Sequence, residues 1–179
     1  GAMAYLPILD ILRSYFEAEE GENEVVIKKR MAERILQLDE KLQGILTPLH
    51  DLLSLKVEDE AYLKLEPKQR RERIFEGLRD LFVRESQNRP LVLSIEDLHW
   101  IDKTSEEFLD YLIGWLANTR ILLILLHRPE YTHRWGSKSY FNRIGLDQLS
   151  LKSSAKLVEA ILERGEVAPE LRELILNRA

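Results

Sequence analysis

The stretch LVLSIEDLHWIDKTS, residues 91–105, decides the fold of this chain. It opens on the apolar run Leu91–Ile95 and reaches, at Thr104, the start of an amphipathic helix. A second apolar run occupies residues 120–127, and Arg128-Pro129 stops it. Two nearly continuous apolar strands joined by an amphipathic helix are typical of a parallel sheet that is covered on both faces. The sequence therefore predicts an α/β fold class in which these two strands are neighbours.

Helical spacing of apolar residues dominates the rest of the chain. Helices are expected at 6–17, 25–42, 46–55, 67–88, 104–116, 150–163 and 169–178, with a third, short strand at 143–149 and a loop at 130–143. Pro67 suits the first turn of its helix. Thr104 and Glu107 have the spacing of a capping box. The sequence therefore predicts that the chain has three parts: a helical segment at 4–89, an α/β core at 90–149 and the start of a helical lid at 150–179. Residues 1–3 are typical of a cleaved expression tag.

Composition excludes several classes of function. The 26 basic and 31 acidic residues give a net charge of −5, so attraction to nucleic acid is not expected. The absence of cysteine excludes disulfides, thiol catalysis and cysteine-ligated metal sites. No apolar run approaches the roughly 20 residues of a membrane-spanning helix. A cytoplasmic location without membrane contact is therefore the expectation.

Three charged residues follow the two strands. Glu96 and Asp97 end the first, and Arg128 comes directly after the second. Ligands of open parallel sheets bind outside the carboxyl ends of the strands. Two acids there can hold Mg²⁺ and orient a water, and a guanidinium beside them can contact a phosphate. The alternatives are that the acids only open a turn and that Arg128 pairs with Glu130 or Glu96.

These residues resemble a known family. The segments LVLSIEDLHWIDKTS and ILLILLHRPEY are similar to the Walker B and sensor segments of STAND-type signalling ATPases, in particular the ATPase modules linked to bacterial cyclases, kinases and DNA-binding regulators. The resemblance covers residues 65–178 well and 5–64 loosely. It implies a P-loop NTPase-like parallel sheet of two or three strands, truncated here, with a large helical N-terminal part and C-terminal helices.

The resemblance also implies roles. Glu96 stands where the family coordinates Mg²⁺, Asp97 where the second acid orients or deprotonates the attacking water, and Arg128 where the γ-phosphate is sensed. Glu96 and Asp97 are thus the expected catalytic and metal-binding residues, and Arg128 the nucleotide-binding one. His99 and Trp100 are expected to pack the turn.

The phosphate loop of that family is missing from this sequence, because no Gly-Lys dipeptide occurs in it. The expectation is therefore a fragment of an ATP- and Mg²⁺-dependent signalling ATPase. The isolated chain would bind no cofactor and be inactive, and the nucleotide state of the parent would switch a fused output domain or protein partner. The alternative is a helical protein-interaction module with a vestigial ATPase fold. Loss of a neighbouring strand would leave an edge at 121–126 unpaired. Either the short strand near 144–148 or a second copy of the chain could pair with this edge, and the expectation is the second copy, which would make a homodimer.

Overall fold

The computed structural model describes residues 5–147, 149–150, 153–154, 156–157 and 160. The chain forms two compact units, Gly1–Tyr140 and Phe141–Ala179. In the second unit, residues 141–147 are irregular, and residues 153–154, 156–157 and 160 are helical. The strand expected at 143–149 is thus absent from residues 143–147. The helix expected at 169–178 lies outside the described residues.

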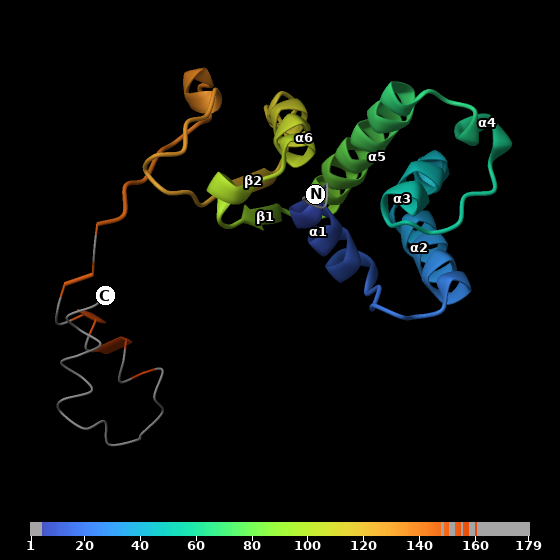
Figure 1. Cartoon of the computed structure of the whole chain (residues 1–179), viewed down its shortest axis with the longest axis horizontal. Coiled ribbons are helices and arrows are strands. Elements are labelled where there is room, and N and C mark those ends of the chain that lie inside the picture. The colour runs from blue at the N-terminus through green and yellow to red at the C-terminus, as the bar shows by residue number, and fades with distance from the viewer. Residues whose placement is uncertain (1–4, 148, 151–152, 155, 158–159, 161–179) are drawn as a thin grey trace. The chain divides into compact units, whose positions relative to one another are not determined.

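The first unit is mostly helical and holds a two-stranded parallel sheet, which confirms the α/β class (Figure 1). Its α-helices are α1 (Leu6–Phe16), α2 (Glu24–Leu38), α3 (Leu46–Leu52), α4 (Glu60–Leu63), α5 (Pro67–Asn88) and α6 (Lys103–Ile113). The strands are β1 (Leu91–Ile95) and β2 (Ile121–Leu125). Short 3-10 helices are η1 (Glu40–Ile45), η2 (Leu98–Trp100) and η3 (Trp135–Ser137).

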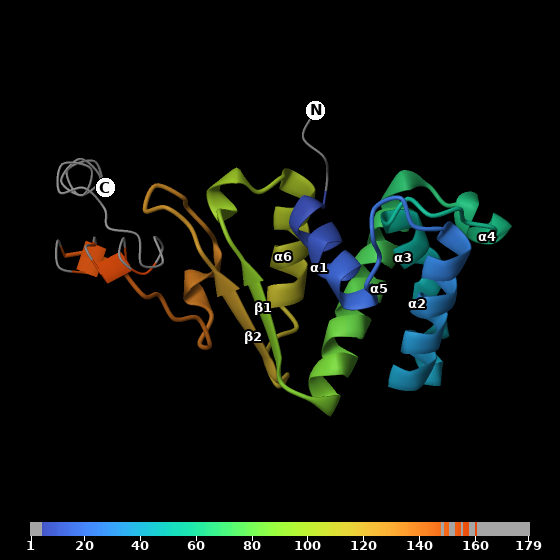
Figure 2. The ribbon, with the colours of Figure 1, turned by 90° about the horizontal axis from the view of Figure 1, so that it is seen from below.

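Helix α5 connects the two sides of this unit. Figure 2 shows it running between the strands and α6 on one side and α2 and α3 on the other. Its start is fixed by Pro67 in the first turn and by the Gln69 side chain, whose Oε1 accepts a hydrogen bond from the Glu66 N–H at 3.0 Å. It ends at Asn88, because Arg89 precedes Pro90 and takes the extended conformation that a following proline favours.

Aromatic side chains form the contact between α5 and α6. The ring of Phe108, which is fully buried, meets that of Phe75 edge to face at 5.3 Å and that of Phe82 at 6.4 Å. Tyr5, just before α1, adds a further edge-to-face contact with Phe75. Such pairs contribute about 0.5–1.5 kcal/mol each beyond the area they bury. The sheet and its flanking helix are therefore firmly attached to the helical part.

Local hydrogen bonds place two helix boundaries differently from the sequence prediction. Helix α2 ends at Leu38 rather than at Leu42, because the Asp39 side chain accepts the Lys41 N–H at 3.0 Å and starts η1. Helix α6 is capped by Asp102 and not by Thr104. The short α4 is a helix that the sequence patterns do not predict, and the Asp59 side chain caps it by accepting the Ala61 N–H at 2.9 Å.

The strands pair in parallel over their whole length, with Leu91 beside Ile121 and Ile95 beside Leu125. Buried and exposed residues alternate along β1, so only one sheet face packs on the helices. The expectation of a sheet covered on both faces is wrong for the part of the chain that the structure describes. The side chains of Val92, Leu122, Ile124 and Leu126 on the second face are 58%, 57%, 40% and 40% exposed.

The cap of α6 yields a testable expectation. Asp102 accepts hydrogen bonds from the Ser105 N–H at 2.9 Å and the Ser105 hydroxyl at 2.6 Å. Burial raises the pKa of this carboxyl, but the hydrogen bonds to Ser105, Tyr5 and Thr104 lower it more, so the pKa falls below its usual range. Asp102→Ala is expected to lower the free energy of unfolding by about 1–2 kcal/mol at neutral pH.

The acid dependence of that difference gives the check. A carboxyl whose pKa is lower in the folded state stabilises the fold above its unfolded pKa, and this stabilisation is lost as the pH falls through the folded pKa. Urea unfolding should thus show wild type and Asp102→Ala converging in acid. Asp10→Ala, which removes an exposed carboxyl on α1, should leave stability nearly unchanged. A pH-independent gap between wild type and Asp102→Ala would contradict this account.

Candidate site at the carboxyl edge of the sheet

The structure brings the predicted site residues to one edge of the sheet. Ile95 and Leu125 are paired, Glu96 and Asp97 directly follow β1, and Arg128 follows β2. All three side chains are exposed. Among the described residues, Arg128 makes no ion pair with Glu96, Asp97 or Glu130. The alternative that Arg128 only pairs with Glu130 or Glu96 is thus not what the structure shows. The guanidinium of Arg128 is open to a ligand.

The turn after β1 is held by the backbone. Asp97 takes a left-handed conformation with φ 51° and ψ 39°, which aspartate tolerates better than most residues. The next N–H, of Leu98, donates to the Leu126 carbonyl at 2.9 Å, and the Leu98 side chain is fully buried. This bond extends the ladder past the end of β1, so the position of Asp97 is coupled to the end of β2.

The two residues expected to pack the turn behave differently. The side chain of His99 is mostly buried, with Nε2 at 3.9 Å from Asp97 Oδ1. Trp100 is 77% exposed, so the expectation that it packs the turn is wrong. The centroids of the Trp100 and His99 rings are 5.4 Å apart. The exposed indole adds an aromatic surface to the same edge of the sheet as the two acids.

The segment that carries Arg128 is anchored on α6. The Tyr131 hydroxyl donates to Glu106 Oε1 at 2.6 Å, Trp135 Nε1 donates to Asp110, and the Tyr140 hydroxyl donates to the Ile113 carbonyl at 2.6 Å. Acceptors at these spacings lie along one side of a helix. Burial, followed by the bond to Glu106, raises the pKa of Tyr131, so it remains a donor at neutral pH. The loop expected at 130–143 is confirmed for residues 130–140, which contain one short 3-10 helix, η3.

Arg120 fixes the other end of β2. Its Nε donates to the Ser86 carbonyl at 2.9 Å and its Nη2 to the Gln87 carbonyl, both in the last turn of α5. The Arg120 carbonyl in turn accepts the Leu91 N–H at 2.9 Å. A basic side chain at a helix C-terminus satisfies carbonyls that the helix leaves unpaired. The strands therefore start from a fixed point, which sets where their carboxyl ends lie.

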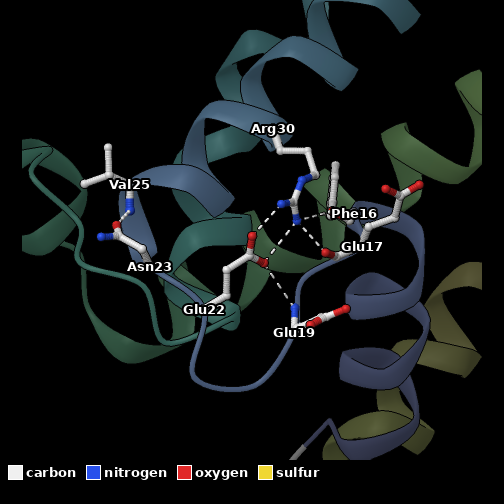
Figure 3. Close-up of polar contacts among 7 residues, drawn as sticks. All are labelled: Phe16, Glu17, Glu19, Glu22, Asn23, Val25 and Arg30. Atoms are coloured by element: carbon white, nitrogen blue, oxygen red, sulfur yellow. Dashed lines mark hydrogen bonds and ion pairs between the residues drawn. The ribbon is translucent and has the colours of Figure 1, made fainter.

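A small surface pocket lies elsewhere, between α1 and α2, with a volume of about 140 Å³. Figure 3 shows the polar contacts beside it, where the Arg30 guanidinium contacts Glu22 at 2.5 Å and the carbonyls at the end of α1. The hydrogen bond from Arg30 lowers the pKa of Glu22. This arrangement joins α1 to α2 and includes none of the predicted site residues.

The acids at the edge are suited to a hard cation. No group of three or more potential metal ligands occurs among the described residues. Mg²⁺ is commonly held by one or two carboxylates together with water and phosphate oxygens, so the exposed pair Glu96 and Asp97 fits it without a third protein ligand. Carboxylate oxygens are ligands that Mg²⁺ prefers over softer donors.

Comparisons with known proteins give a distant relative. A protein of Rhizobium meliloti (strain 1021), described only as uncharacterized, is 28% identical over 95 residues, which are 53% of this chain and 9% of that protein. The chain thus corresponds to a small part of that relative's length. No family model and no solved structure matches the chain. In the part of the chain that the structure describes, no helix combines the length and apolar character needed to cross a membrane.

Proposed function

We propose that this chain supplies the acidic and sensor side of a nucleotide site in a signalling ATPase of the STAND type. The observation that carries the proposal is the meeting of Glu96, Asp97 and Arg128 at the carboxyl edge of a parallel sheet. This is where open α/β sheets bind ligands. The resemblance of residues 91–105 and 121–131 to Walker B and sensor segments supports it. The truncated P-loop NTPase-like sheet is part of the same proposal.

Each residue has a proposed role. Glu96 holds Mg²⁺, which would neutralise phosphate charge and draw electrons from the bond that breaks. Asp97 orients or deprotonates the attacking water, and the hydrogen bond from the Leu98 N–H to the Leu126 carbonyl holds the backbone of the turn that carries it. Arg128 contacts the terminal phosphate, where a guanidinium can stabilise developing negative charge. Through Arg128 and β2, the state of the nucleotide would reach the helical part and a fused output domain or partner.

Two carboxylates cannot hold a triphosphate by themselves. They repel it, and the residues that attract it in such enzymes are the backbone amides and lysine of a Gly-Lys-Ser/Thr loop. That sequence does not occur in these 179 residues. We therefore propose that the loop belongs to a longer polypeptide that carries this chain. A helical protein-interaction module with a vestigial ATPase fold is the alternative, favoured by the predominance of helix in the first unit.

Titration calorimetry with ATP and Mg²⁺ tests the proposal. The 179-residue chain is expected to bind too weakly to detect. A longer polypeptide that adds the Gly-Lys-Ser/Thr loop is expected to bind ATP and to hydrolyse it. Micromolar binding by the 179-residue chain would refute the division of the site between two segments. A longer polypeptide with an intact loop that does not hydrolyse ATP would favour the interaction module instead.

A further inference from the structure

The backbone of Arg128 is held by two neighbouring residues. Its carbonyl accepts the Tyr131 N–H at 3.1 Å, which closes a turn over Pro129 and Glu130. Proline suits the second position of such a turn, because its ring presets φ. The same carbonyl lies 2.8 Å from His127 Nδ1, and since a carbonyl only accepts, this nitrogen donates. The Arg128 carbonyl is therefore fixed from both sides.

One side chain then ties this turn to α6. The Tyr131 hydroxyl donates to Glu106 Oε1 at 2.6 Å, in a partly buried setting. A hydrogen bond from a hydroxyl to a carboxylate is short and about twice as strong as one between neutral groups. The Tyr131 ring also meets the His127 ring, with their centroids 5.4 Å apart. The turn is thus attached to a helix that Phe108 in turn packs against α5.

The side chain of Arg128 makes no use of this support within the protein. Its guanidinium is exposed and forms no ion pair or hydrogen bond with another described residue. A fixed backbone under a free charged side chain therefore does not serve the fold through that side chain. It suits a side chain that meets a ligand, because supporting contacts formed in advance reduce the entropy lost on binding.

We propose that Tyr131 is a positioning residue for Arg128, because its bond to Glu106 holds the turn that presents the guanidinium to the terminal phosphate of a nucleotide. This inference rests on the proposed function, which makes that phosphate the ligand of Arg128. Tyr131 acts through Arg128 and not on the ligand. The Tyr140 hydroxyl is the matched comparison, since it donates to the Ile113 carbonyl on the same helix but stands further along the chain from Arg128.

NMR relaxation of the backbone amides in the 179-residue chain tests the anchor without nucleotide or metal. The order parameters of the Arg128 and Tyr131 amides are expected at about 0.85 in wild type and to fall toward about 0.6 in Tyr131→Phe. Glu106→Leu should reproduce this fall from the other side of the bond. Tyr140→Phe should leave both amides rigid. Unchanged order parameters in Tyr131→Phe and Glu106→Leu overturn the proposal.

A double-mutant cycle in a longer polypeptide that hydrolyses ATP tests the role. Arg128→Ala is expected to lower turnover about 10³-fold, and Tyr131→Phe about 10-fold, because a misplaced guanidinium is weakened and not lost. If Tyr131 acts only through Arg128, Tyr131→Phe should add nothing to Arg128→Ala, so effects that multiply overturn the proposal. If wild type hydrolyses no ATP but Tyr131→Phe loosens the turn as expected, the proposed function fails while the anchoring of the turn stands.

Discussion

Asp97→Asn, made in a longer polypeptide that hydrolyses ATP, is expected to lower turnover by about 10²–10⁴-fold, the usual contribution of a general base. ATP affinity should change little, because Asp97 is proposed to act on the water and not on the nucleotide. Asparagine also tolerates the left-handed conformation at this position, so the turn should survive. Steady-state hydrolysis and ATP titration of the same sample would separate the two effects.

Two companion variants make this result interpretable. Glu96→Gln should weaken the Mg²⁺-dependent binding of ATP as well as turnover, because Glu96 is proposed to hold the metal. Asp10→Asn removes an exposed carboxylate on α1 and should hydrolyse ATP at the wild-type rate. If Asp97→Asn and Glu96→Gln both keep wild-type turnover, the proposed roles of these acids are wrong.

Leu78→Ala is expected to lower the free energy of unfolding by about 2–5 kcal/mol, the cost of removing a buried leucine side chain and leaving a cavity. Leu78 is fully buried in α5, the helix that joins the sheet to the helical part. Since a small domain is stable by only about 5–15 kcal/mol, this one change should remove much of its stability. Urea unfolding followed by circular dichroism would measure it.

Leu36→Ala is the matched control. Leu36 lies in α2 and is 52% exposed, so the same chemical change removes little buried surface. Its expected cost is below about 1 kcal/mol. Similar losses from the two substitutions would mean that α5 does not hold the core in solution as it does in the structure.

Local rules predicted much of the fold. Pro67 marks the start of α5, Pro90 separates it from β1, and two apolar runs around an amphipathic helix indicate parallel strands, all of which the structure contains. Competition between neighbouring side chains was harder to foresee. Asp102 lies earlier in the sequence than Thr104 and takes the cap because its carboxylate reaches the N–H of Ser105. Whether the second face of the sheet is covered depends on which other segments pack on it. The composition of the two strands does not determine that.

The site was predictable to the extent that topology determines it. Parallel neighbours end at the same edge, so the meeting of Glu96, Asp97 and Arg128 followed from the strand assignment. The contacts that fix the edge were not predictable. The bond from the Leu98 N–H to the Leu126 carbonyl depends on the exact register, and the anchors of residues 131–140 depend on which side of α6 they reach. Both are contacts between segments far apart in the sequence.

The exposure of Trp100 gives this edge of the molecule an optical reporter of its own. An indole in water emits at longer wavelengths than a buried one and is open to collision with a dissolved quencher. Trp135 is buried, and Trp115 is half-exposed with the Arg79 guanidinium carbon 4.4 Å from its ring centroid, so the three indoles differ in their surroundings. Trp100 alone stands beside the two acids. Its fluorescence would therefore register an event at that edge without any label attached to the protein.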